Sequence, residues 1–254
     1  MFTLQQVGFR VEGRNLLQEI SLQLKPSRIY GLIGHNGSGK STLIKLLARQ
    51  YKPTCGQICF NQQNINLFSN REYAAKVAYL PQQLPLAGHL LGEELVAMGR
   101  YRSTGLLGRM QLEDYAAIDR AFNLTTTQSF RHQLVDQLSG GERARIWLAM
   151  CLAQQSEFLL LDEPLAALDI RHQLEVMDLI KRLSQDLNLG IVIVIHDINL
   201  AARYCDELVA MKQGRLLKIA TPTEMMTTDE LAQIYGLKMT IIEHPLTHQP
   251  IALP

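Results

Sequence analysis

The alternation of apolar and polar positions divides the chain into strand-like and helix-like stretches. Residues 4–24 alternate with a break at 13–15, which is typical of two antiparallel strands with one buried face. Short apolar runs predict further strands at 57–60, 77–80, 158–161 and 191–195. Helical spacing is found at 93–100, 113–122, 171–187 and 228–235. The strand, helix and strand over 158–195 predict a right-handed crossover in a parallel sheet.

The middle of the chain differs from its two ends. Residues 83–155 carry helical patterns and no strong strand, with loops expected around 103–108 and 125–129. This segment therefore predicts a helical insertion in an α/β core. The last portion, 221–254, contains one short helix and a tail with prolines. Its two histidines, His244 and His248, indicate a solvated tail in preference to a metal site.

Composition narrows the class of protein. The chain has 254 residues, of which 47% are hydrophobic and 19% charged, with a net charge of +1. That balance is typical of a globular protein and gives no indication of nucleic-acid binding. No apolar run approaches the roughly 18 residues of a membrane span, and the N-terminus lacks the order of a signal peptide. Four cysteines without C-x-x-C spacing are expected to act as small apolar residues in a reducing compartment, the cytoplasm.

A glycine-rich segment lies between the apolar run at 29–33 and a stretch with helical spacing. It matches the phosphate-binding pattern G-x-x-x-x-G-K-[ST] at every specified position, as Gly34-His35-Asn36-Gly37-Ser38-Gly39-Lys40-Ser41. Backbone N–H groups of such a loop surround phosphate oxygens, and glycines leave the space for them. We expect Lys40 to reach the β- and γ-phosphates, Ser41 to bind Mg²⁺ and Thr42 to support the α-phosphate region. The sequence therefore predicts a nucleoside triphosphate site.

Two acids end the apolar run at 158–161. Asp162 and Glu163 follow it directly, at the edge of a parallel sheet where ligands bind. In enzymes with a phosphate-binding loop, an aspartate at this place holds Mg²⁺ through water, and a neighbouring acid polarises the attacking water. These roles are predicted for Asp162 and Glu163.

The segment Leu138-Ser139-Gly140-Gly141-Glu142 places a hydroxyl and bare glycine backbone at the start of a helix, which is an anion site in principle. It could also be an ordinary serine-capped helix. The segment resembles the signature sequence of ATP-binding cassette (ABC) proteins. That resemblance implies a P-loop NTPase fold of the ABC ATPase type, with a mainly parallel core sheet, an antiparallel β subdomain and an inserted α-helical subdomain. It also implies that Ser139, Gly140, Gly141 and Glu142 face the nucleotide bound by a second copy.

The resemblance assigns further roles by position. Gln82 matches the glutamine that contacts Mg²⁺ and links core to helical subdomain, and Asp169, in Ala167-Leu168-Asp169, matches the loop that crosses the dimer interface. His196 matches the histidine that contacts the γ-phosphate. Together with Lys40, Gln82 and Glu163 it makes up the expected catalytic set. Residues 1–254 are expected to form one ABC ATPase domain, with core 1–84 and 156–220, helical subdomain 85–155 and C-terminal part 221–254.

The sequence departs from the usual motifs in three places, the last of them two residues long. Val11 stands where the family often stacks an aromatic residue on adenine, so the adenine contact is expected to be aliphatic or supplied by Phe9. This leaves the preference for ATP over GTP open. Ala144 replaces the usual glutamine after the signature, and Leu165-Ala166 replaces Thr-Ser after the acids. None of these changes removes a catalytic group.

Within the family, the chain is most similar to ATPase subunits of bacterial importers of iron siderophores, haem and cobalamin, above all the ferric hydroxamate type. The similarity is carried by 31–37, 77–85, 94–101 and 196–206. It implies ATP and Mg²⁺ as cofactors, a head-to-tail dimer, a membrane permease contacted through its coupling helix and, indirectly, a siderophore-binding protein. The expected location is peripheral, on the cytoplasmic face of the inner membrane. The alternative is an ABC ATPase that moves no cargo, such as an iron–sulfur cluster assembly factor.

Overall fold

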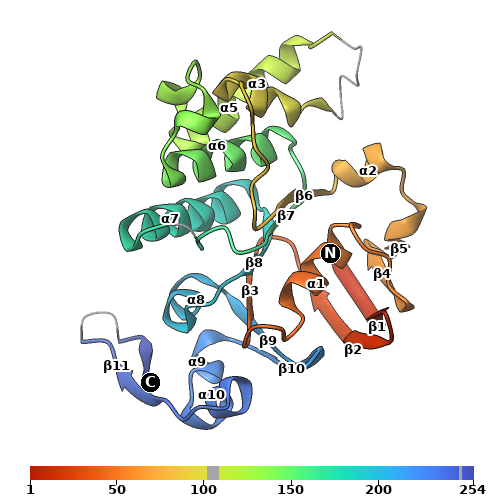
Figure 1. Ribbon diagram of the computed structural model, residues 1–254, viewed down its shortest axis with the longest axis vertical. Helices are drawn as coiled ribbons and strands as arrows, with labels where there is room; N and C mark the ends of the chain where they lie inside the picture. The colour runs from red at the N-terminus through yellow and green to blue at the C-terminus, as the bar shows by residue number, and fades with distance from the viewer. Residues whose placement is uncertain (102–108, 167, 246–247) are drawn as a thin grey trace. The chain divides into compact units, whose positions relative to one another are not determined.

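The computed structural model describes residues 1–101, 109–166, 168–245 and 248–254 (Figure 1). These residues form two compact units, one of Met1–Leu67 with Gly190–Pro254 and the other of Phe68–Leu189. The loop expected around 103–108 lies outside the described residues. Throughout the described ranges, no helix combines the length and the apolar character that crossing a membrane requires.

The first unit contains most of the strands. Its elements are β1 (Phe2–Val11), β2 (Arg14–Leu24), β3 (Ile29–Ile33), α1 (Lys40–Leu47), β4 (Cys55–Phe60), β5 (Gln63–Asn64), β8 (Gly190–Val194), α8 (Ile198–Tyr204), β9 (Glu207–Lys212), β10 (Arg215–Ala220), α9 (Pro222–Met225), α10 (Thr228–Tyr235), β11 (Thr240–Glu243) and β12 (Pro250–Leu253). A short 3₁₀ turn covers Ile65–Leu67.

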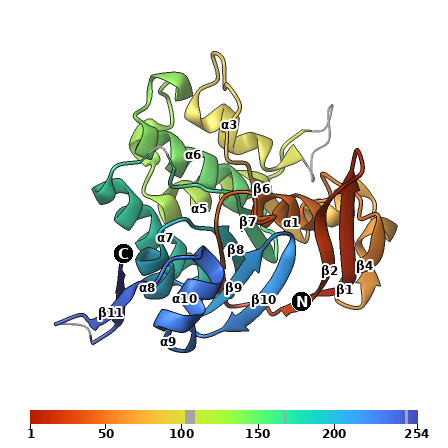
Figure 2. The same cartoon turned by 60° about the horizontal axis from the view of Figure 1, so that its bottom comes forward.

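The predicted antiparallel strands are confirmed. β1 and β2 pair from Phe2↔Leu24 to Val11↔Arg14, and the sheet order is β2-β1-β4-β5. Alternate residues of β2 are buried, as expected of a sheet with one covered face. The ring of Phe2 meets that of Phe60 edge-on at 4.9 Å and closes the core between β1 and β4. Figure 2 shows these strands side by side.

A parallel sheet forms the centre of the same unit. β3 lies between β8 and β9 and runs parallel to both, while β10 pairs antiparallel with β9. All five residues of β3 and of β8 are buried, because α1 packs on β8 and α8 on β3. The strands β9 and β10 were not predicted. The carboxyl end of β3 leads directly into the glycine-rich loop.

The second unit combines helices with two parallel strands. Its elements are α2 (Asn70–Ala74), β6 (Val77–Leu80), α3 (Gly92–Met98), α5 (Leu112–Thr125), α6 (Gly140–Ala153), β7 (Phe158–Leu161) and α7 (Ile170–Leu187). Two 3₁₀ turns cover Gln128–Phe130 and Val135–Gln137. β6 and β7 are in parallel register from Val77↔Phe158 to Leu80↔Leu161. The predicted helices at 93–100, 113–122 and 171–187 correspond to α3, α5 and α7.

A buried ion pair connects three of these helices. Arg100, just beyond α3, donates from Nε to Asp114 Oδ1 of α5 at 2.9 Å. Its Nη1 donates to the Ala153 carbonyl at the end of α6 at 2.8 Å, and to Gln155 Oε1 at 2.9 Å. The side chains of Arg100 and Asp114 are 7% and 5% exposed, so the guanidinium depends on these acceptors to replace water.

The compact units do not follow the predicted subdomain boundaries. Residues 68–84 and 156–189 group with the helices, because β6 pairs with β7 and α6 packs on both β6 and α7. The predicted boundaries of the helical subdomain, after residues 84 and 155, are based on the positions of the sequence motifs and stay a prediction.

The C-terminal part folds back onto α8 within the first unit. The predicted helix at 228–235 is confirmed as α10, whereas the hairpin of β11 and β12 was not predicted. Asn199 of α8 acts as an edge partner for β12: its Nδ2 donates to the Ala252 carbonyl at 3.0 Å, and its Oδ1 accepts from the Ala252 N–H at 2.8 Å. His248 contacts Glu243 across the hairpin. In the described parts of the chain, no three histidine, cysteine or acidic side chains cluster as metal ligands would.

Candidate nucleotide site

The glycine-rich loop connects β3 to α1 and has the backbone of an anion cradle. Gly34 has φ +137°, and a Cβ there would lie 2.2 Å from the Met211 carbonyl oxygen. Gly39, the N-cap of α1, has φ +104° and lies against Leu17. Around Gly37, at φ +77°, nothing lies within 4 Å of where a Cβ would be. The loop is therefore packed tightly at both ends and open in its middle, which suits a ligand that approaches the backbone.

Lys40 lies within this loop. Its side chain is buried, and Nζ donates to the carbonyls of Gly34 at 2.7 Å and His35 at 3.0 Å. The ammonium group thus stabilises the loop and adds positive charge beside the N-terminus of α1. Ser41 and Thr42 occupy the first turn of α1 and are partly exposed.

Two further predicted residues belong to the first unit. His196 follows β8 and is exposed, just before the helix α8 that Asp197 caps. Val11 ends β1 and is 42% exposed. The ring of Phe9 stacks on Tyr51, with centroids 5.1 Å apart and planes 9° from parallel. Tyr51 therefore covers one face of the Phe9 ring.

In the second unit, the carboxyl ends of β6 and β7 bring three predicted residues together. Asp162, directly after β7, is fully buried and accepts a hydrogen bond from the Tyr79 hydroxyl at 3.4 Å. Gln82 follows β6 and donates from Nε2 to Glu163 Oε2 at 2.6 Å. Glu163 has φ +52°, a backbone conformation that non-glycine residues seldom adopt and that often accompanies function. Because β6 and β7 are parallel neighbours, residues 81 positions apart meet at one edge.

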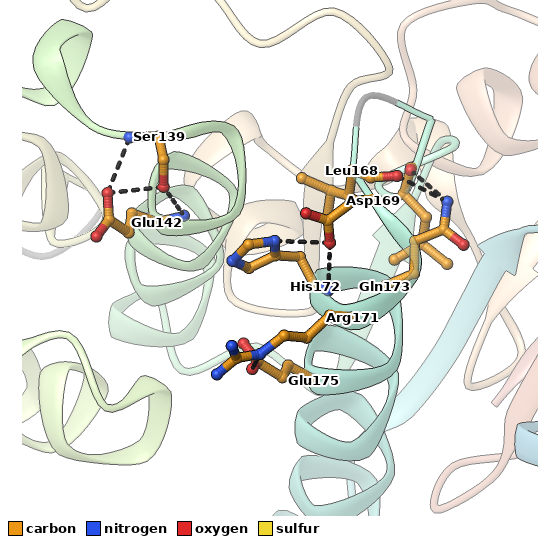
Figure 3. A network of polar contacts seen from close by, with 9 residues as sticks. Ser139, Glu142, Leu168, Asp169, Arg171, His172, Gln173 and Glu175 are labelled. Atoms are coloured by element: carbon orange, nitrogen blue, oxygen red, sulfur yellow. Dashed lines mark hydrogen bonds and ion pairs between the residues drawn. The ribbon is translucent and has the colours of Figure 1, made fainter.

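The signature segment begins α6. Ser139 is the N-cap: its backbone N–H and its hydroxyl donate to Glu142 Oε2 at 2.8 and 2.7 Å, and its Oγ accepts from the Glu142 N–H at 3.5 Å (Figure 3). The hydroxyl and then the backbone N–H of Ser139 hold the pKa of Glu142 below its usual value. The serine-capped helix that the sequence allowed is thus present, and Ser139 stays exposed at its start.

Asp169 is the N-cap of α7, as Ser139 is the N-cap of α6. Its Oδ1 accepts from the His172 backbone N–H at 2.9 Å and from His172 Nδ1 at 2.8 Å, and these two bonds, the backbone one first, lower the pKa of Asp169 (Figure 3). Gln173 donates to the carbonyls of Leu165 and Leu168, at 3.3 and 3.0 Å, and holds the preceding loop. Sequence reasoning missed His172, although its place three residues after an N-cap aspartate could have indicated it. Ala167 lies outside the described residues.

The predicted residues are therefore divided between the two units. The first unit holds Val11, the loop Gly34–Thr42 and His196. The second holds Gln82, Asp162, Glu163, the signature segment Ser139–Glu142 and Asp169. Each group is assembled within its own unit by the ends of parallel strands or by helix N-termini, which are the places where oxyanions bind.

Comparison with known proteins adds independent findings. A family model described as ABC transporter matches residues 17–166. The petrobactin import ATP-binding protein FpuC of Bacillus anthracis is 38% identical over 96% of this chain and 89% of its own length. The iron(3+)-hydroxamate import ATP-binding protein FhuC of Bacillus subtilis is 36% identical over 98% and 93%. A solved dimeric structure of MJ0796, a bacterial ABC transporter cassette, superposes with a TM-score of 0.76 at 25% identity, covering 87% of this chain and 99% of that one.

Proposed function

This chain belongs to the ABC transporter family, and we propose that it is the ATPase subunit that powers uptake of an iron siderophore, ferric hydroxamate foremost, through a partner permease. The cargo proposal rests on the likeness to FpuC and FhuC over nearly the whole of each chain, since the first is named a petrobactin import protein and the second an iron(3+)-hydroxamate import protein. The ATPase itself is supported by the matched family and by the chemistry of the two residue groups described above.

In this proposal two copies pair head to tail around two ATP molecules. Lys40 and the N–H groups of the loop at 34–42 bind the phosphates, while Ser139 and Gly141 of the partner subunit approach the γ-phosphate from the other side. Asp169 crosses the interface near the partner's loop. The open space around Gly37 fits a polyphosphate, because no neighbouring atom obstructs its approach to the loop backbone there, and the Lys40 ammonium adds positive charge within the same loop.

Mg²⁺ would be held by Ser41, Gln82 and Asp162. Their hydroxyl, amide and carboxylate oxygens are the hard ligands this ion takes, and a fully buried carboxylate such as Asp162 gains from a nearby cation. When bound, the ion neutralises charge on the β- and γ-phosphates.

Glu163 acts as the general base. Its carboxylate takes a proton from the attacking water as the water oxygen bonds to the γ-phosphorus and the bond to the bridging oxygen breaks, which yields ADP and phosphate. The hydrogen bond that Gln82 donates orients the carboxylate. His196 steadies the γ-phosphate. Closure of the pair excludes bulk water from these groups.

The permease is proposed to insert its coupling helix near Gln82 and residues 86–105, of which 102–105 lie outside the described ranges. Leu86, Met98 and Tyr101 support this, since their side chains are 90%, 52% and 53% exposed and offer apolar contacts to a partner. The protein would then be peripheral on the cytoplasmic face of the inner membrane, and a siderophore-binding protein on the other side would deliver the cargo.

Glu163→Gln tests the base assignment. We expect the variant to keep ATP binding, to accumulate as an ATP-bound dimer and to lose about 10²-fold or more in turnover, the scale of general-base loss. Glu157→Gln is the matched control, because it makes the same acid-to-amide change in an exposed ion pair with Lys76. Near-normal turnover in Glu163→Gln would remove this residue from the base role.

Affinity purification of the tagged chain from solubilised membranes of its host tests the transport assignment. We expect an iron-siderophore permease to co-purify, and loss of ferric hydroxamate uptake when the gene is deleted. A soluble cluster-assembly partner without a permease would favour the alternative, an ABC ATPase that moves no cargo.

A further inference from the structure

The imidazole of His172 lies between the signature segment and the loop that ends at Asp169 (Figure 3). On one side its ring covers Gly141: a Cβ on Gly141 would lie 2.7 Å from His172 Cδ2 and 3.0 Å from Cγ. Gly141 is buried in this contact. No side chain larger than that of glycine fits beneath the ring without displacing it.

On the other side, the ring is held by Asp169. His172 Nδ1 donates to Asp169 Oδ1 at 2.8 Å, a charge-assisted bond in addition to the one from the backbone. The imidazole therefore contacts both segments that the proposed function directs at the nucleotide of the second copy.

We infer that His172 is a positioning residue that couples the signature segment to the Asp169 loop, so that both meet the partner's nucleotide in register. The inference rests on the proposed in-trans roles of Ser139 and Asp169. An imidazole suits the task because it combines a flat face, which packs on a glycine, with a ring nitrogen that bonds a carboxylate.

The cap of α7 does not depend on this ring. The His172 side chain is 35% exposed, and the cap of α7 is completed by the His172 backbone N–H, which every substitution except proline retains. Loss of the imidazole should therefore affect the geometry of the two segments and leave the start of α7 intact.

Two substitutions separate the two contacts. His172→Asn retains a donor near the position of Nδ1 but lacks the ring over Gly141, whereas His172→Phe retains a ring and lacks the donor. Arg171→Ala is the matched control, because this neighbour on α7 is 84% exposed and pairs with Glu175 instead. For each variant we would measure kcat, KM and the Hill coefficient for ATP, the affinity of the isolated chain for a fluorescent ATP analogue, and the thermal midpoint.

We expect kcat to fall about fivefold or more in both His172 variants, with the Hill coefficient moving toward 1. In His172→Phe the cause is loss of the hydrogen bond to Asp169, which corresponds to a fold-change of about that size, and in His172→Asn it is loss of the ring that packs on Gly141. ATP-analogue affinity and the thermal midpoint should stay at wild-type values, since the chain's own phosphate loop lies in the other unit. Arg171→Ala should behave as wild type. Wild-type kcat and cooperativity in both His172 variants, or a kcat loss matched by an equal loss of the folded fraction, would overturn the inference.

A double variant tests whether His172 acts through Asp169. If His172 acts through Asp169, Asp169→Asn and His172→Phe should together cost no more in kcat than the more severe of the two alone; additive losses would refute the coupling. The wild type and Ser139→Ala are assayed alongside. If hydrolysis by the wild type is non-cooperative and Ser139→Ala does not alter it, the in-trans site and this inference are both overturned. If the wild type is cooperative and the His172 variants are unaffected, this inference alone is overturned.

Discussion

Replacing Asp114 by asparagine is expected to destabilise the second unit by about 3 kcal/mol, the lower end of the range for breaking a buried ion pair. The substitution keeps the size of the side chain and an oxygen that can accept the Gln111 N–H, which Asp114 Oδ2 binds at 2.9 Å. It removes the charge opposite Arg100, whose side chain is 7% exposed. The Arg100 guanidinium still donates hydrogen bonds to the carbonyl of Ala153 and to the side-chain amide oxygen of Gln155. For this reason we expect the loss of stability to lie at the lower end of that range.

The assay follows urea unfolding by tryptophan fluorescence. The chain contains one tryptophan, Trp147, which is buried in α6, one of the three helices that the Arg100–Asp114 pair connects. A loss of about 3 kcal/mol should also lower the thermal midpoint by roughly 6–12 °C in a chain of this length. The control Glu157→Gln breaks an exposed pair and should change stability by no more than about 1 kcal/mol.

A double variant tests the reasoning behind the magnitude. Arg100→Leu with Asp114→Leu removes both buried charges, so it should cost less than the sum of the two single changes. A loss below about 1 kcal/mol in Asp114→Asn, or strict additivity in the double variant, would show that the pair is solvated in solution and that the burial argument fails.

Two more outcomes follow from contacts described above. Asn199→Leu should make the β12 amides exchange their hydrogens rapidly, because the Ala252 N–H and carbonyl lose their hydrogen bonds to Asn199. Slow exchange in that variant would show that Asn199 does not anchor the hairpin. Ser139→Ala should raise the pKa of Glu142 toward its ordinary value, as measured by NMR titration. Because the pKa of Glu142 is lower in the folded state than its value of about 4.5 in the unfolded chain, ionised Glu142 stabilises the cap of α6 fully above about pH 4.5. This stabilisation is lost as the pH falls through the lower pKa of the folded state. An unchanged pKa of Glu142 in Ser139→Ala would contradict this reasoning.

Local patterns were sufficient for much of this protein. Residues 4–24 alternate in a way that only paired strands with one buried face satisfy, and β1 and β2 are found there. The phosphate loop was predictable because glycines and Lys40 must stand at fixed spacing between a strand and a helix, and β3 and α1 flank it as expected. Each of these features depends on neighbours within a few residues.

Other elements carried too weak a local signal. β11 has a single half-buried residue and no apolar alternation, so nothing in its sequence indicated a strand. It becomes one because β12 pairs with it and Asn199 anchors β12. Likewise β10 is an edge strand with one fully buried residue, and its pairing with β9 defines it.

The contacts that shape the candidate site were decided by tertiary structure. The bond between Gln82 and Glu163 exists because β6 and β7 are parallel neighbours, and the packing of His172 on Gly141 exists because α6 and α7 lie against each other. The resemblance to ABC proteins identified Gln82, the pair of acids after an apolar run identified Glu163, and neither identified His172. Sequence determines which groups can bind phosphate, since that chemistry is local. Contacts between those groups form only when whole strands and helices pack together. The free energy of that packing comes from burying entire elements and cannot be read from a short segment.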